Sequence, residues 1–270
     1  MLEKMHIKRR IPMSYKICLP QGKRKALTFS YDDGQIHDRR LVELFDKYGL
    51  KATFHLNSGT LDTPGFITSD ELTTLYANHE IACHGVNHLW PRHLSREQMV
   101  TEIWEDRKAL EAKTGRIVNG MSYAFGEYSD EFVTTAKALG ILYSRTVEAI
   151  DGYNAPADFL KWHPSAHHND LFKDDTLVSR FIDLDEYYDM PLLYIWGHSF
   201  EFDREGTWDK MEELCKRLAG HDDIWYVTNI EFYRYIQAVR SLESSADGTK
   251  LYNTSSTPIW INEDGVLKTI

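Results

Sequence analysis

Cysteine is scarce in this chain of 270 residues. Cys18, Cys83 and Cys215 are widely spaced, which excludes a disulfide framework. Long apolar runs are missing as well, because no stretch approaches the roughly 20 apolar residues of a membrane span. The charges near the N-terminus are not followed by the apolar core of a signal peptide. The sequence therefore predicts an intracellular, cytoplasmic protein with no membrane partner.

Positive charge is also in short supply. Lys and Arg number 31 against 41 Asp and Glu, so the formal net charge is −10. This balance argues against a nucleic-acid partner bound through its phosphates, and the only basic cluster, at residues 8–10, is too short to change that. A hydrophobic content of 42% with 27% charged residues is ordinary for a globular protein. The length suits one large domain, including an α/β barrel.

A strand–helix rhythm extends from about residue 25 to residue 240. Strands are predicted at residues 26–30, 52–56, 80–83, 120–124, 141–144, 192–196 and 224–227, separated by helical patterns. Repeated β–α units favour a parallel sheet with covering helices, and seven units suit a TIM-type barrel that lacks one unit. An open, doubly wound sheet is the alternative. Residues 1–242 are assigned to the barrel, and the turn-rich residues 243–270 to a small C-terminal β appendage.

Two polar runs, SYDDG at residues 30–34 and HGVNH at residues 84–88, each follow a predicted strand. Taken alone, Asp-Gly is a common turn signal and His-x-x-x-His is often solvated helix surface. Together they lie where parallel α/β folds keep their sites, at the carboxyl ends of strands. Carboxylate and imidazole suit a borderline ion such as zinc. One carboxylate and two histidines would leave coordination positions open, as in a catalytic metal site.

Further polar groups are predicted on the same face of a barrel. The run YAFG at residues 123–126 closes the fourth strand, and His198 closes the sixth. Of the adjacent carboxylates Asp32 and Asp33, one could bind a metal while the other acts as a base. A histidine across the pocket could act as the acid. A metal ligand, a base and an acid in one pocket suit metal-assisted hydrolysis of an acyl group.

These motifs resemble those of the polysaccharide deacetylases, carbohydrate esterase family 4. The family's Thr-Phe-Asp-Asp-Gly resembles residues 28–34, TFSYDDG, with two residues interposed. Its His-x-x-x-His is similar to residues 84–88, its Arg-x-Pro-Tyr-Gly to SYAFG at residues 122–126, and its apolar strand ending in histidine to residues 193–198. The resemblance covers roughly residues 25–235. It implies a distorted seven-stranded (β/α) barrel.

The resemblance also implies a role for each matching position. One divalent ion, with zinc favoured over cobalt, nickel or manganese, would be bound by Asp33, His84 and His88. The same resemblance makes Asp32 the general base and His198 the acid. It assigns the oxyanion contact to the backbone N–H of Phe125. Substrate contacts are predicted for Tyr123, Trp162 and Trp196.

The third motif departs from the family pattern. Ser122 stands where the family has an arginine that pairs with the base, and Ala124 replaces the proline. Loss of that cation should let the pKa of the base rise unless another residue substitutes. Asp174 or Asp175 could tune His198, with helix surface as the alternative. Among the other histidines, His55 could point into the barrel, and His163, His167 and His168 either line the pocket mouth or pack ordinarily.

These residues favour a metal-dependent deacetylase, a hydrolase that acts on an N- or O-acetylated saccharide or another small acetylated substrate. An alternative on the same fold is a hydrolase of a small amide or a cyclic ureide. A catalytically silent carbohydrate-binding protein is the third possibility. The presence of both Asp32 and His198 argues against it, because a pure binder needs neither a base nor an acid.

Overall fold

The computed structural model describes residues 15–184 and 190–270. The basic cluster at residues 8–10 and the N-terminal segment considered for a signal peptide lie outside the described residues. Of the helices in the described ranges, none has both the length and the apolar character needed to cross a membrane.

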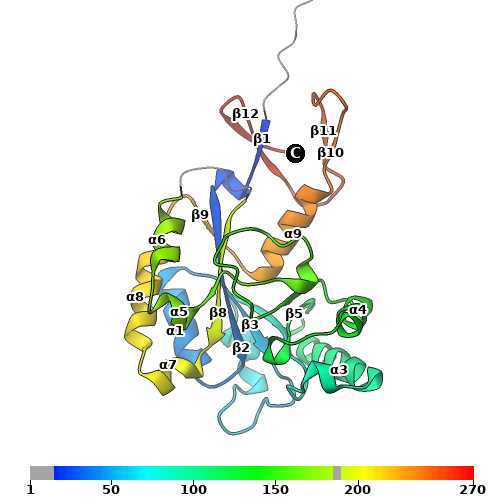
Figure 1. The fold of residues 1–270 in the computed structure, drawn as a ribbon, viewed down its shortest axis with the longest axis vertical. Helices are drawn as coiled ribbons and strands as arrows, with labels where there is room; N and C mark the ends of the chain where they lie inside the picture. The colour runs from blue at the N-terminus through cyan, green and yellow to red at the C-terminus, as the bar shows by residue number, and fades with distance from the viewer. Residues whose placement is uncertain (1–14, 185–189) are drawn as a thin grey trace, which may run out of the picture.

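A parallel sheet forms the centre of the molecule (Figure 1). Its middle strand, β2, pairs with β3 on one side and β8 on the other, and β9 pairs with the start of β2. The strand order is β6-β5-β4-β3-β2-β8-β7. The bounds are β2 (Lys25–Asp33), β3 (Ala52–Leu56), β4 (Glu80–Cys83), β5 (Gly120–Ser122), β6 (Tyr143–Arg145), β7 (Ala166–His167), β8 (Leu192–His198) and β9 (Ile224–Tyr226).

An irregular segment, residues 162–167, joins the two ends of this strand path. At its start Trp162 bridges to Arg145 of β6, and at its end β7 pairs with β8. The sheet therefore curves back on itself. This confirms the prediction of a distorted seven-stranded (β/α) barrel over that of an open, doubly wound sheet.

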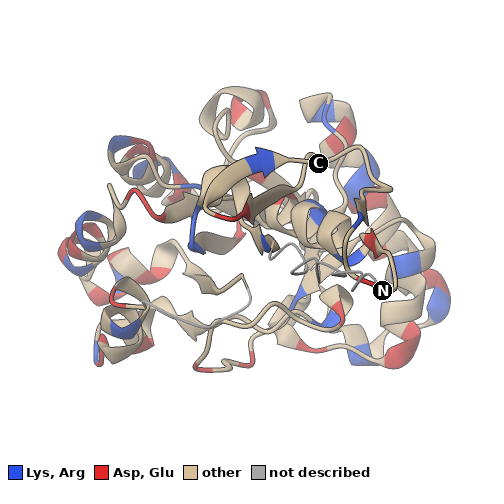
Figure 2. Ribbon diagram, turned by 90° about the horizontal axis from the view of Figure 1, so that it is seen from above, with Lys and Arg blue, Asp and Glu red and all other residues tan. Residues whose placement is uncertain are grey.

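Helices surround the sheet. The longer ones are α1 (Asp38–Tyr48), α3 (Arg96–Thr114), α4 (Asp130–Ala138), α8 (Trp208–Leu218) and α9 (Asn229–Arg240), and the shorter ones are α2 (Leu72–Leu75), α5 (His168–Leu171), α6 (Thr176–Ile182) and α7 (Phe200–Glu205). Helix α1 buries Leu41, Val42 and Phe45 on one face, at the 3.6-residue spacing of an amphipathic helix. Figure 2 shows basic and acidic residues side by side on the peripheral helices.

A second, antiparallel sheet lies at the amino ends of the barrel strands (Figure 1). It consists of β1 (Tyr15–Cys18), β12 (Trp260–Glu263) and β13 (Val266–Thr269), and a short hairpin of β10 (Glu243–Ser244) and β11 (Leu251–Tyr252) lies beside it. The strand at residues 15–18 was not predicted. Its alternation is weak, and it is fixed by pairing with β12 near the other end of the chain.

Candidate active site

The two central strands extend further than the sequence pattern predicts, and this extension positions the site. Strand β2 continues to Asp33 instead of ending at residue 30, and β8 continues to His198 instead of residue 196. The parallel register pairs Asp32 with His198 on one side and with His55 on the other. The two aspartates therefore belong to the end of the strand. A strand boundary predicted from hydrophobicity falls too early here, because the backbone hydrogen-bond ladder continues through the polar residues.

Asp33, His84 and His88 form a set of groups that could hold one cation. The Nε2 atoms of His84 and His88 lie 3.5 and 3.7 Å from Oδ1 of Asp33. Ligand atoms at roughly 2.0–2.1 Å from one tetrahedral ion are separated by roughly 3.4 Å. Two imidazoles and one carboxylate also form a donor set that zinc accepts. Both the spacing and the chemistry of these residues fit a divalent ion.

Ser122 fixes the orientation of His84. Nδ1 of His84 lies 3.0 Å from the carbonyl oxygen of Ser122 and 2.7 Å from its hydroxyl. A carbonyl oxygen can only accept, so Nδ1 carries the proton and Nε2 keeps its lone pair toward Asp33. A hydrogen bond of this type to the remote nitrogen is the usual way in which a metal-binding histidine is oriented.

Unusual backbone conformations gather at the predicted site residues. Asp33, His88 and Phe125 have φ values of 81°, 54° and 57°, in the left-handed region. Non-glycine residues pay of order 1–3 kcal/mol for such strained conformations and cluster at functional sites. The Phe125 ring lies 4.5 Å from that of His88 and stacks on Trp90 at 4.1 Å. The oxyanion candidate and a ligand candidate therefore pack against each other.

Asp32 lies in a buried network with Arg145. The carboxylate is 3% exposed, its Oδ2 forms an ion pair with the Arg145 guanidinium, and its Oδ1 accepts from the hydroxyl of Ser122 at 3.1 Å. Arg145 is fully buried, donates to Ser30 Oγ at 3.1 Å and to the Thr146 carbonyl at 2.9 Å, and so has a fixed position.

The pKa of Asp32 follows from this network. Burial alone would raise it, but the charge of Arg145, with further contributions from His84, His55 and His198, holds the pKa of Asp32 well below its usual range. Arg145 therefore substitutes for the arginine that the third motif lacks, and the pKa rise expected on its loss does not occur. Arg145 directly follows the strand predicted at residues 141–144. Its strand-end position was the signal that could have identified it.

Glu201, which the sequence analysis did not single out, organises the opposite side of the site. Its Oε2 accepts the backbone N–H of His198 at 3.2 Å and lies 3.6 Å from His198 Nδ1. Burial would lower the pKa of His198, but the carboxylates of Glu201, Asp32 and Asp33 outweigh burial and raise it. His198 therefore tends to keep the proton that a general acid must supply. The available signal was the spacing of three residues between His198, which ends β8, and Glu201 in the first turn of α7.

His167, His198 and Glu201 also lie close enough together to hold a cation. The hydrogen bonds argue for a different arrangement. The Asn169 N–H donates to His167 Nδ1 at 3.1 Å, so the proton of the neutral ring is on Nε2, which lies 3.1 Å from Glu201 Oε2. A ligand nitrogen needs its lone pair. His167 therefore acts as a donor that holds the Glu201 carboxylate in place.

We predict that Glu201→Gln shifts the basic limb of the pH profile of kcat/KM to lower pH. The acid must be protonated to act, and loss of the Glu201 charge lowers the pKa of His198, so activity fades at a lower pH than in the wild type. The profile should be measured beside that of Glu205→Gln, an exposed position on the same helix. Superimposable profiles for all three proteins would show that Glu201 does not act on His198.

Two of the three predicted substrate contacts are buried. Trp162 and Tyr123 are each 1% exposed, Trp162 packs against Tyr143 and Tyr194, and the Tyr123 hydroxyl donates to the Leu160 carbonyl. Burial in the core removes both from the reach of a substrate. Trp196 is partly exposed, and its ring lies 4.4 Å from the Arg145 guanidinium.

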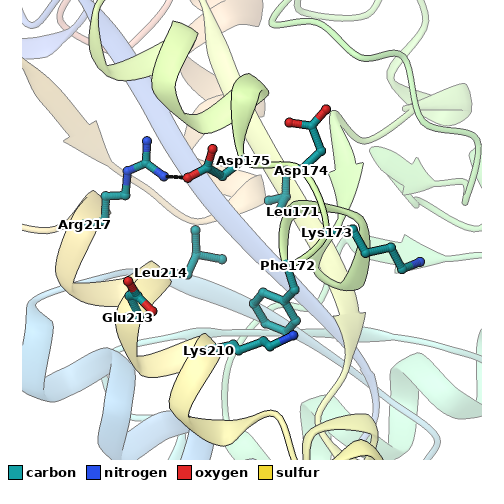
Figure 3. A pocket seen from close by; sticks show the side chains of 9 residues that line it. All are labelled: Leu171, Phe172, Lys173, Asp174, Asp175, Lys210, Glu213, Leu214 and Arg217. Carbon is teal, nitrogen blue, oxygen red and sulfur yellow. Dashed lines mark hydrogen bonds and ion pairs between the residues drawn. The ribbon is translucent and has the colours of Figure 1, made fainter.

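Asp174 and Asp175 do not approach His198. They line a separate surface pocket of about 400 Å³, where Asp175 forms an ion pair with Arg217 and Asp174 accepts from the Thr176 N–H (Figure 3). Both residues therefore lie at the surface just before α6, with Asp175 at its N-cap, and neither tunes His198.

The remaining histidines differ in their surroundings. His55 points into the barrel, with Nδ1 3.1 Å from Ser30 Oγ and 3.4 Å from Asp32 Oδ1, and burial lowers its pKa to about 3. His168 is buried against Phe202. His163 is partly exposed and hydrogen-bonds the hydroxyl of Thr146.

Fold and site together define a (β/α) barrel with carboxylates and histidines at the carboxyl ends of its strands. Residues 20–144 match the family model described as polysaccharide deacetylase. This match confirms the resemblance to polysaccharide deacetylases found in the sequence.

Three known proteins are similar to this chain over half of its length or more. It is 24% identical over 143 residues to the Bacillus subtilis (strain 168) protein named "Putative polysaccharide deacetylase YxkH", which covers 51% of each protein. The chain thus spans about half the length of the curated relative it matches. A solved "putative polysaccharide deacetylase from Mycobacterium smegmatis" is 16% identical, covers 84% of this chain and 96% of that one, and superposes with a TM-score of 0.60, which shows a shared fold. The Streptococcus pyogenes deacetylase PplD in complex with acetate is 23% identical over 54% of this chain and 65% of its own, with a TM-score of 0.49.

Proposed function

We propose that this protein is a metal-dependent deacetylase that hydrolyses the acetyl group of an N- or O-acetylated saccharide. The observation that carries the proposal is the pairing of a buried, ionised Asp32 with Arg145 directly beside the Asp33, His84 and His88 set. The distance of 3.8 Å between Asp32 Oδ2 and His84 Nε2 shows how close the base and a ligand candidate lie. The family match of residues 20–144 supports the reaction class.

Asp33, His84 and His88 would hold the ion. When bound, a divalent ion supplies a Lewis acid and lowers the pKa of water at the site. Asp32 accepts the proton of the attacking water, since its carboxylate is ionised and fixed by Arg145 and Ser122. His198 gives a proton to the leaving amine or alcohol. The Phe125 N–H donates to the oxyanion, a contribution of roughly 3–4 kcal/mol for a well-placed donor.

Hydrolysis of a small amide or cyclic ureide remains the second candidate function. The observation that favours it is the burial of Trp162 and Tyr123, which leaves Trp196 alone among the three predicted sugar contacts. The proton-transfer groups would act in the same way on either substrate. A silent binder is less consistent with the site, because binding alone requires neither the Asp32–Arg145 pair nor the His198–Glu201 pair.

We expect one divalent ion per chain, most favourably zinc. His84→Ala or His88→Ala removes one of three ligands and should abolish stoichiometric binding. Elemental analysis of metal-loaded, desalted protein measures the ratio. His93→Ala is a matched control, because His93 lies in the adjacent segment and stacks on Trp90 outside the ligand set. A wild-type ratio in both ligand variants would reject the assignment.

We expect metal-loaded protein to hydrolyse small aryl acetates, because the aryloxide of an ester is a better leaving group than the amine of an amide. Acetate release from chito-oligosaccharides, acetylated xylo-oligosaccharides and muropeptides then tests the saccharide proposal, and ring opening of allantoin and cyclic imides tests the alternative. Turnover confined to the last two compounds would replace the saccharide proposal. An inert protein across the whole series, aryl acetates included, would point to a silent binder.

A further inference from the structure

Helix α3 holds the backbone of the HGVNH loop, residues 84–88, through two acidic residues. Asp106 Oδ2 accepts the N–H groups of His84 and Gly85, both at 3.0 Å, and the His84 N–H is shared with the Leu56 carbonyl at 2.9 Å. The Val86 N–H donates to the Glu102 carbonyl at 3.2 Å, and the Asn87 N–H to Glu102 Oε2 at 2.9 Å. Four consecutive N–H groups of the loop therefore point to Glu102 and Asp106, which lie one turn apart on the helix.

The carboxylates of these two residues are buried. Glu102 is 4% exposed and Asp106 is fully buried. Within residues 15–184 and 190–270, neither forms an ion pair with Lys, Arg or His. Asp106 Oδ1 also accepts the Ser58 N–H at 2.8 Å, and Glu102 Oε1 accepts the Asn87 amide at 2.9 Å. The Ser58 hydroxyl and the Cys83 thiol are further hydrogen-bond partners of Asp106. Such charge-assisted hydrogen bonds are about twice as strong as neutral ones.

The conformation of the loop explains why acceptors are needed at this point. Gly85 and His88 have φ values of 85° and 54°, so the chain leaves β4 without a helix or strand to satisfy its N–H groups. Glycine at position 85 permits the close approach, since a Cβ added there would lie 2.9 Å from Glu102 Oε2. Helix α3 thus holds the backbone from His84 to Asn87, the stretch that connects the two histidines.

We propose that Glu102 and Asp106 are positioning residues that preorganise His84 and His88 for a divalent cation. The proposal rests on the proposed function, because it assigns these residues to the same ligand set. Negative charge on these carboxylates, next to the ligand loop itself, also favours a cation in front of it. Each acts through the loop and does not contact the ion.

The test is a titration with Co²⁺, whose visible absorption reports both affinity and ligand geometry. Asp106→Asn and Glu102→Gln keep the side-chain shape but remove the charge and part of the acceptor capacity. Outer partners of metal ligands typically contribute 10–100-fold to metal affinity, so we expect a Kd increase of about that size and an altered cobalt spectrum in both variants. The control is Glu105→Gln, an exposed position on the same helix that pairs with Lys108.

The thermal midpoint of each metal-free variant separates positioning from stability. Folded variants with the wild-type Kd and spectrum, even if less heat-stable, would overturn the proposal, because the residues would then serve folding alone. If Asp106→Asn does not fold, Glu102→Gln decides the matter by the same readouts. A wild type that binds no cobalt would overturn the proposed metal site and this inference together, whereas wild-type binding that both variants reproduce would overturn only this inference.

Discussion

Replacing Asp32 by Asn is expected to lower kcat by about 10²–10⁴-fold while one metal ion per chain is retained. The amide has nearly the shape of the carboxylate but cannot accept the proton of the attacking water. Since Asp32 stands outside the Asp33, His84 and His88 set, the ligands remain in place. Steady-state rates on an aryl acetate and elemental analysis of the same sample measure both quantities.

His198→Ala should show a loss of similar size, because it removes the partner that protonates the leaving group. The matched control for Asp32→Asn is Asp46→Asn, the same substitution at an exposed carboxylate on α1. Near-normal turnover by Asp32→Asn would refute its role as the base. Loss of the ion from that variant would instead make Asp32 a ligand.

Replacing Arg145 by Met is expected to lower the free energy of unfolding by about 3–5 kcal/mol, because it leaves the buried Asp32 carboxylate without its cation. In the wild type the folded pKa of Asp32 is depressed, so the carboxylate stabilises the fold above its unfolded pKa of about 3.9, and this contribution is lost as the pH falls. In the variant the pKa of Asp32 rises. Since the base must be ionised, the acid limb of the pH–rate profile should move to higher pH.

Urea denaturation and the pH profile of kcat/KM test these expectations. Arg39→Met is the matched control, since Arg39 forms an exposed pair with Glu71 and its loss should cost no more than about 1 kcal/mol. The double substitution Ser122→Arg with Arg145→Ser returns the cation to the family's usual position. It should move the acid limb of the pH–rate profile part of the way back from its position in Arg145→Met toward that of the wild type. An unchanged acid limb in Arg145→Met would show that Arg145 does not control the pKa of Asp32.

The sequence determined the features that depend on short stretches of chain. Strands at residues 52–56 and 80–83 have the predicted bounds, because apolar runs and flanking turns define them locally. The capping box of Ser95 and Gln98 at the start of α3 is likewise a purely local contact, between residues three positions apart. The number of β–α units, together with the family resemblance, predicted the barrel. The motifs singled out five residues that the structure brings to one end of the sheet: Asp32, Asp33, His84, His88 and His198.

Only the tertiary structure decided which distant side chains meet. Arg145 reaches Asp32 across 113 residues of chain, and no local pattern encodes that pairing, because it depends on how the sheet closes. The same holds for Trp162, which was predicted to contact the substrate but which is buried where it bridges to β6. Strand β1 exists through its pairing with β12, at the far end of the chain. The residues that make up the motifs were therefore predictable, whereas the partners that set their pKa values and orientation depend on barrel closure and burial.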